Sequence, residues 1–263
     1  MKKKLTMLGV AAAMSLSMNA QAGIVDLFTD VTPQLEDFTV GGPAVETFTN
    51  GAGIIGGQRD VSVELLQDTD IVNPNNGVRI FIGGGKLSFS NDTDAAGEGV
   101  VQWDGSGDGG SLTLDPSGLG GIDLASVANA FIYEVLSVDL GFRISIEAYT
   151  DANNYTKALI ETNSPGQDVI PFANLENAAL CNTMPNIPNG LISVNCGTGG
   201  PVNMADVGAL QIVLNVDGGT FAVDLSIREI TSTTVPEPTS IALLGAGLVG
   251  AGVAGRRRKA KKS

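Results

Sequence analysis

One short loop of the sequence carries oxygen-bearing side chains at the spacing of a calcium site. In the segment DGSGDGGSLTLD, Asp104, Ser106, Asp108, Gly109 and Asp115 take positions 1, 3, 5, 6 and 12 of an EF-hand-like loop. Calcium is a hard cation that binds several oxygens, and such a turn can bring three of them together. Asp instead of Glu at position 12, and the lack of flanking helix patterns, favour a flexible turn between two strands. Calcium remains the alternative and is the one cofactor that the sequence suggests. A second, weaker calcium candidate groups three neighbouring residues: Asn91, Asp92 and Asp94.

Two features close to these loops each have a functional and a structural interpretation. Trp103, the single tryptophan, could stack on a sugar ring if it were exposed, but its setting in VVQW favours a buried strand position. Arg59 and Asp60 are adjacent, and we expect them to form an ion pair that fixes the first sheet. The sequence therefore favours structural roles and keeps sugar stacking by Trp103 as the alternative.

The composition argues against most kinds of enzyme. The chain contains no histidine, which excludes His-based triads, zinc sites with His ligands and histidine general bases. A serine nucleophile would need a lysine partner, and no such motif is present. Two carboxylates could serve a glycosidase, but no pair stands out among so many acids. We therefore predict no catalytic residues, and a hydrolase is the least favoured alternative.

The C-terminal segment has four parts in a fixed order. Pro236 and Pro238 flank Glu237 and keep the backbone extended. Residues 241–255 are uncharged and would be about 22 Å long as a helix, which makes a marginal membrane span. The final RRRKAKK is basic, and the positive-inside rule keeps it cytoplasmic. We expect the cytoplasmic stop to be formed by a run of arginines: Arg256, Arg257 and Arg258.

This tail resembles the PEP-CTERM sorting signal of Gram-negative, exopolysaccharide-producing bacteria. The resemblance covers 235–263 and implies that Pro236, Glu237 and Pro238 form the motif recognised by exosortase, an integral-membrane cysteine protease. It also implies that the tail is removed at a bond near Val235–Pro238 and that the body is released or transferred to the outer surface. The membrane would then hold the protein only transiently, through residues 241–255.

The N-terminus has the layout of a secretory signal peptide. Lys2, Lys3 and Lys4 precede an apolar stretch, and the small residues of NAQA predict cleavage by signal peptidase after Ala22. The predicted organisation is therefore a signal peptide at 1–22, a body at 23–234 and a sorting signal at 235–263. We find no linker that would divide the body.

The body is strongly acidic once both signals are set aside. Three lysines belong to the first segment and six basic residues to the last, so six basic and 27 acidic residues remain, a formal charge of about −21. Such a surface repels nucleic acid and anionic lipid and attracts cations. Nucleic acid is therefore excluded as a partner.

The two cysteines predict a disulfide. Export places Cys181 and Cys196 in an oxidising compartment, and the segment between them holds two prolines and little periodicity. A bond closing a loop of about 15 residues is worth on the order of 3 kcal/mol in the chain-entropy model. Two thiols without histidine make a poor zinc site.

The body alternates apolar and polar residues with a period of two, which indicates half-buried strands. FRISIEAY places Phe142, Ile144 and Ile146 on one face, with Ser145 and Glu147 on the other. ALQIVLNV and FAVDLSIREI alternate likewise, and residues 217–219 (DGG) between them predict a hairpin turn. About ten short strands with Gly, Asn and Asp turns predict an all-β, antiparallel two-sheet sandwich.

The region from Gly56 to Leu124 also resembles the bodies of other PEP-CTERM proteins, through GGQRD, SFSN and QWDG. That looser resemblance implies a jelly-roll-like sandwich similar to carbohydrate-binding modules. We therefore expect an exported surface or biofilm-matrix protein associated with exopolysaccharide. The alternative is a carbohydrate-binding module, with or without Ca²⁺, delivered by the same route.

The sorting signal leads to a direct prediction about processing. Replacing Glu237, or removing RRRKAKK, should leave the precursor in the inner membrane, because the motif is no longer recognised or the stop is lost. Intact-mass measurement of protein from the native host checks this and locates both cuts. Recovery of extracellular protein that still carries Arg256–Arg258 would contradict it.

Overall fold

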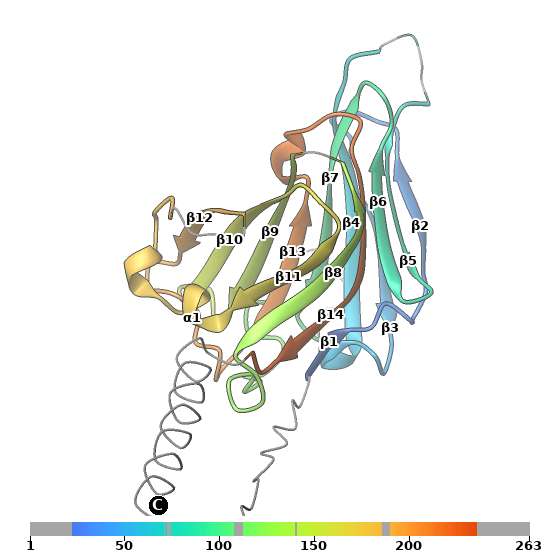
Figure 1. Cartoon of the computed structure of the whole chain (residues 1–263). Helices are drawn as coiled ribbons and strands as arrows, with labels where there is room; N and C mark the ends of the chain where they lie inside the picture. Colours follow the sequence, from blue (N-terminus) through green and yellow to red (C-terminus); the bar gives the residue numbers. More distant parts are fainter. Residues whose placement is uncertain are drawn as a thin grey trace, which may run out of the picture.

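The body folds as two antiparallel β-sheets stacked face to face (Figure 1). A computed structural model describes residues 23–235, apart from 71, 73–74, 108–112, 140 and 186–189. The strands of this part are β1 (Gly23–Asp26), β2 (Thr32–Asp37), β3 (Val45–Asn50), β4 (Gln58–Asp68), β5 (Val78–Gly83), β6 (Lys86–Asn91), β7 (Ala95–Trp103), β8 (Ala130–Val138), β9 (Phe142–Tyr149), β10 (Tyr155–Thr162), β11 (Gly166–Pro171), β12 (Leu191–Cys196), β13 (Ala209–Leu214) and β14 (Asp224–Thr233). The short helical turns are η1 (Ile55–Gly57), α1 (Phe172–Leu175), η2 (Ala178–Leu180) and η3 (Val216–Gly218).

The strand order confirms the predicted two-sheet sandwich. Sheet A has the order β11-β8-β14-β6-β5-β2, and β1 pairs with the last residues of β14. Sheet B has the order β12-β10-β9-β13-β7-β4-β3. All of these strand pairs are antiparallel. Consecutive strands often lie in different sheets, so the fold depends on pairings between distant parts of the sequence.

The core lies between the sheets and follows the predicted alternation. Phe142, Ile144 and Ile146 of β9 are buried against sheet A. Phe142 meets Phe89 of β6 edge to face, with ring centroids 5.7 Å apart, so one aromatic pair links the two sheets. Burying one such side chain contributes roughly 1.5–3 kcal/mol, and apolar burial is the main term that holds the sandwich together.

A charged cluster is built into this apolar core. Arg59 of β4 is 0% exposed, and its Nη1 lies 2.8 and 2.7 Å from the two carboxylate oxygens of Asp26 on β1. Its Nη2 donates to Thr32 Oγ1, and Trp103 Nε1 donates to Asp26 Oδ2 at 2.9 Å. The prediction that Arg59 pairs with Asp60 is therefore wrong. Successive strand residues face opposite sides of a sheet, so Asp60 points outward while Arg59 points into the core.

The predicted hairpin at residues 217–219 is also wrong. β13 lies in sheet B and β14 in sheet A, and η3 carries the chain from one sheet to the other. Asn215, in a left-handed conformation with φ 52°, organises this crossing. Its Nδ2 donates to Gly97 O and Thr220 O, and its Oδ1 accepts from Thr220 N. These bonds close a longer loop than a two-residue hairpin needs.

The predicted disulfide is confirmed. Cys181, directly after η2, is bonded to Cys196 at the end of β12, with the two Cα atoms 5.2 Å apart. The bond ties the irregular segment after α1 to the edge of sheet B.

Both predicted signals fall outside this description. The signal peptide at 1–22, and the motif and span that follow residue 235, lie beyond the described residues. Within the part that is described, no helix combines the length and apolar character needed to cross a bilayer.

The buried ion pair gives a stability prediction. Asp26→Asn should destabilise the body by about 3–5 kcal/mol, because it leaves the guanidinium of Arg59 buried without a counter-charge. Glu134→Gln is the matched control, since its pair with Arg228 is about half exposed and should be worth about 0–1 kcal/mol. Urea unfolding of the mature body measures both free energies. Equal losses for the two variants would contradict a special role for the buried pair.

Candidate functional site

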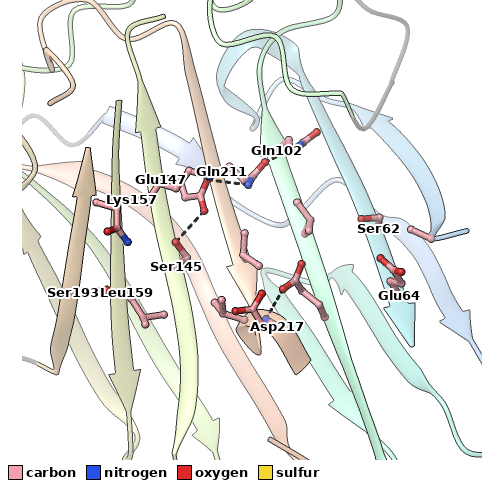
Figure 2. Close-up of a pocket in the computed structure, with 16 residues that line it drawn as sticks. Ser62, Glu64, Gln102, Ser145, Glu147, Lys157, Leu159, Ser193, Gln211 and Asp217 are labelled. Atoms are coloured by element: carbon pink, nitrogen blue, oxygen red, sulfur yellow. Dashed lines mark hydrogen bonds and ion pairs between the residues drawn. The ribbon is translucent and has the colours of Figure 1, made fainter. Parts of the chain in front are cut away.

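An open groove with a volume of about 610 Å³ lies on the outer face of sheet B (Figure 2). Its lining comes from six neighbouring strands, β12, β10, β9, β13, β7 and β4, together with η3. The inner faces of the same strands form the core, so the rigid sandwich fixes the position of every side chain in the groove.

One row of polar side chains runs across the groove, and its β4 member, the buried Asp60, lies beyond the lining residues. Its members are directly opposite one another in strand register, and all of them face outward. In strand order the row is Asn195, Lys157, Glu147, Gln211, Gln102 and Asp60. We call this set the polar row.

Glu147 is the centre of the polar row. Its side chain is only 5% exposed, and Ser145 Oγ donates to Oε1 at 3.0 Å. Oε2 accepts from the hydroxyl of Tyr149 and from Gln211 Nε2, and it pairs with Lys157 Nζ at 2.9 Å. Burial and the adjacent carboxylate raise the pKa of Tyr149, so its phenol stays protonated and donates. Four donors therefore hold this carboxylate in one orientation.

The amides beside Glu147 are oriented in the same chain of hydrogen bonds. Gln211 Nε2 donates to Glu147, so its Oε1 is left to accept from Gln102 Nε2 at 2.6 Å. Figure 2 shows these three side chains on adjacent strands. The order of donors and acceptors along the polar row is thus fixed before any ligand binds.

A second row lies next to the polar row and is more apolar. In strand order, this row is Leu159, Ser145, Val213, Val100 and Ser62. The groove therefore combines hydrogen-bonding groups with flat aliphatic surface.

Carboxylates gather at the η3 end of the groove. Glu98 on β7 is directly opposite Glu64 on β4, and Glu98 Oε2 accepts from the backbone N–H of Asp217 at 2.7 Å. Burial raises the pKa of Glu98, and the negative charges of Asp217, Glu64 and Glu147 add to the effect. Only the Asp217 N–H opposes it. The potential at this end is strongly negative.

The predicted calcium loop is only partly described. Asp104 is buried, and its Oδ2 accepts the backbone N–H of Asp115 at 2.8 Å. The carboxylate of Asp115 accepts from the N–H and Oγ of Ser117 instead. Ser106 is exposed, and Asp108 lies outside the described residues. Within the described residues, no group of three or more acidic or cysteine side chains is arranged to hold a metal. Calcium at this loop stays a prediction.

Side-chain oxygens of the second calcium candidate form ion pairs and hydrogen bonds within the protein. Asp92 pairs with Arg79 at 2.6 Å and accepts the Gly77 N–H. Asn91 Oδ1 accepts the Gly97 N–H. These residues support the β5–β6 end of sheet A.

Trp103 takes the buried strand position that the sequence favours, which excludes the alternative of sugar stacking. The side chain is 1% exposed and lies in the core, where its indole N–H bonds Asp26. Two aromatic side chains, Tyr149 and Tyr155, are paired in register beside the polar row, with ring centroids 5.3 Å apart. Lys157 Nζ lies 5.7 and 5.8 Å from these two centroids, at the β10 side of the polar row.

The sequence reasoning missed the groove itself. It assigned Ser145 and Glu147 to the outward face of β9 but gave them no partners, because register across six strands cannot be seen in one sequence. The available signal was that Glu98, Gln102 and Gln211 are long polar side chains on central strands. On a central strand, such residues mark a face that is used for something other than packing.

Comparison with known families finds a match at the C-terminus. Residues 234–259 match the family described as the PEP-CTERM protein-sorting motif. The match confirms the predicted sorting signal, and this motif implies an exported protein that exosortase recognises and processes. It covers the tail and leaves the body unassigned, and no curated protein matches the chain.

Two solved structures show weak likenesses to the chain. One, titled "Structure of PfGH50B", has a TM-score of 0.35 and 8% identity, over 61% of this chain and 22% of that chain. Another, titled "Structural analysis of an exo-beta-agarase", has a TM-score of 0.34 and 9% identity, over 78% of this chain and 26% of that chain. The chain thus spans about a quarter of the length of these proteins, and such low scores carry no functional argument.

The acidic end of the groove gives a pH prediction. The pKa of Glu98 is raised in the folded body, so folding is favoured while this carboxyl is protonated. The stability that results is fully present below the ordinary pKa of 4.5, and it is lost as pH rises through the pKa of the folded state. Glu98→Gln cannot ionise and keeps an acceptor for the Asp217 N–H. It should therefore be more stable than wild type at pH 7 by about 0.2–1 kcal/mol, the range for cross-strand pairs.

Below pH 4.5 that gain should vanish, since the wild-type carboxyl is then neutral as well. Thermal melts at pH 7 and pH 3.5 measure the difference, and Glu229→Gln, an exposed glutamate of sheet A, is the control. A difference between Glu98→Gln and wild type that is equal at both pH values would contradict the assignment.

Proposed function

We propose that this exported PEP-CTERM protein, once exosortase has processed it, acts as an exopolysaccharide-associated surface or matrix protein that holds a glycan chain in the groove of sheet B. The polar row is the observation that carries the proposal. It presents ordered donors and acceptors along the floor of a groove of about 610 Å³.

The length of the polar row suits a chain better than a small molecule. Six neighbouring strands span about 24 Å at the usual spacing between strands. A glycan of several units repeats hydroxyl groups that both donate and accept, and the amides of Gln102 and Gln211 can do the same. The aliphatic surface of Leu159 and Val213 suits the C–H faces of sugar rings.

Charge selects the class of glycan. Lys157, the one cation in the groove lining, is already paired with Glu147, while Glu64, Glu98 and Asp217 add negative charge. An acidic polysaccharide would be repelled by this groove and by a body of about −21. The proposed ligand is therefore a neutral polysaccharide.

We further propose that the groove binds its glycan without cleaving it. Glu147 is held by four donors and Glu98 by the Asp217 N–H, which suits fixed hydrogen-bond acceptors. Release of reducing sugar from the bound glycan by the purified body would favour a hydrolase instead.

Titration with the host's own exopolysaccharide, separated into neutral and acidic fractions, tests the proposal. The neutral fraction should stabilise the mature body by about 2.7 kcal/mol at 100 times the dissociation constant, which a melting shift reveals. Gln211→Ala should weaken binding about tenfold, or about 1.4 kcal/mol, because Gln211 links Glu147 to Gln102. Gln167→Ala, on the exposed edge strand β11, is the matched control and should bind as wild type does.

Two results would contradict the proposal. One is the absence of any saturable melting shift with the neutral fraction, which would leave a purely structural matrix role. The other is an equal loss of affinity in Gln211→Ala and Gln167→Ala, which would place the glycan outside the groove.

A further inference from the structure

The folded body ends directly at the sorting motif. β14 finishes at Thr233, the described chain continues to Val235, and the motif begins at Pro236. The matched sorting region starts at residue 234, so the body and the signal share residues 234 and 235. No spacer separates the sandwich from the segment that exosortase must engage.

Val235 is fastened to the body by one side chain. Its N–H donates to Asn129 Oδ1 at 2.7 Å, and its C=O accepts from Asn129 Nδ2 at 2.7 Å. The carboxamide of Asn129 thus uses both hydrogen-bonding groups of the Val235 backbone. We call this pair of bonds the Asn129 latch.

The latch is anchored on both sides. The backbone N–H of Asn129 donates to Thr233 O at 3.0 Å, and its C=O accepts from Phe172 N at 2.8 Å. Thr234 Oγ1 adds a bond to Val127 O at 3.4 Å. Asn129 is therefore held by the start of α1 and the end of β14, and its side chain is directed at Val235.

Both ends of the described chain meet at this end of the sandwich (Figure 1). Gly23, the first residue of the body, is opposite Ser232 in register, where β1 pairs with β14. The latch therefore lies at the end of the body that adjoins the membrane-directed tail in the precursor.

Proteases hold extended substrate through main-chain hydrogen bonds on both sides of the cleaved bond, as an added strand does. A cut at or just beyond Val235 requires the N–H and C=O that Asn129 occupies. We propose that Asn129 restrains the sorting reaction: its latch on Val235 must open before exosortase can bind the segment, so the latch limits the rate at which the body is released. This inference rests on the sorting signal and is independent of the glycan proposal.

A pulse-chase experiment on the full-length precursor in its native host tests the latch. Asn129→Ala should shorten the half-life of the precursor by about fivefold, because two hydrogen bonds to Val235 are lost. Asn129→Asp keeps the acceptor for the Val235 N–H but loses the donor to its C=O, and it should give an intermediate half-life. Asn163→Ala removes a comparable bond to the Gly141 N–H at the opposite end of the sandwich and should process as wild type does.

A precursor with an inserted spacer distinguishes the effect of the latch on processing from a general loss of stability. Inserting Gly-Ser-Gly-Ser after Val235 moves the motif away from the latch, and Asn129→Ala should then have no further effect on the half-life. In a host without exosortase every precursor should persist, which excludes other proteases. Melting of the mature bodies shows whether the variants are folded. A half-life for Asn129→Ala that is unchanged or longer, or an effect that persists with the spacer, overturns the proposal.

Discussion

The buried ion pair between Arg59 and Asp26 is the interaction on which the arrangement of the two sheets depends. Arg59 belongs to sheet B and Asp26 to β1 of sheet A, and neither reaches solvent. A lone charge at this depth would cost several kcal/mol, so the core tolerates Arg59 only when β1 is in place. β1 in turn pairs with the last residues of β14. The ion pair therefore also ties the end of β14, through β1, to sheet B. Trp103 Nε1 completes the carboxylate's hydrogen bonding and ties β7 into the cluster.

The same strands that build this core also build the groove, because side chains alternate between the two faces of a sheet. On β4, Arg59 points into the core and Asp60 points outward; on β7, Trp103 points inward and Gln102 outward. Sheet B is therefore polar on a face that a sandwich ordinarily leaves to solvent, and its polar groups are paired with one another. Ordering these groups in advance lowers the conformational entropy that the protein's side chains lose when a ligand binds. The groove is rigid because the core behind it is rigid.

Strands and the disulfide could be predicted from the sequence, because they depend on local pattern. Side-chain partners across the sheets could not, because they depend on strand register. Alternation in FRISIEAY and ALQIVLNV predicted β9 and β13, and the presence of two cysteines in an exported chain predicted the disulfide. The partner of Arg59 lies 33 residues away, on a strand that the adjacent Asp60 could not suggest. Residues 217–219 had the composition of a hairpin turn, but the side chain of Asn215 organises a crossing between sheets. The polar row joins residues as far apart as Asp60 and Gln211, and nothing in the sequence orders them.

The basic tail and the acidic body carry charges of opposite sign. Of the six basic residues in the body, five form ion pairs with acidic residues in the described structure, in Arg59, Arg79, Arg143, Lys157 and Arg228. Most of the 27 carboxylates consequently have no internal cation to neutralise them. The positive-inside rule places the basic tail on the cytoplasmic side of the membrane, while the exported acidic body lies on the opposite side. Once the tail is removed, only the charge of the body remains, and an anionic lipid surface repels it over a Debye length of about 8–10 Å. Cleavage therefore removes the membrane anchor, and the negative charge of the processed body does not favour its return to anionic lipid.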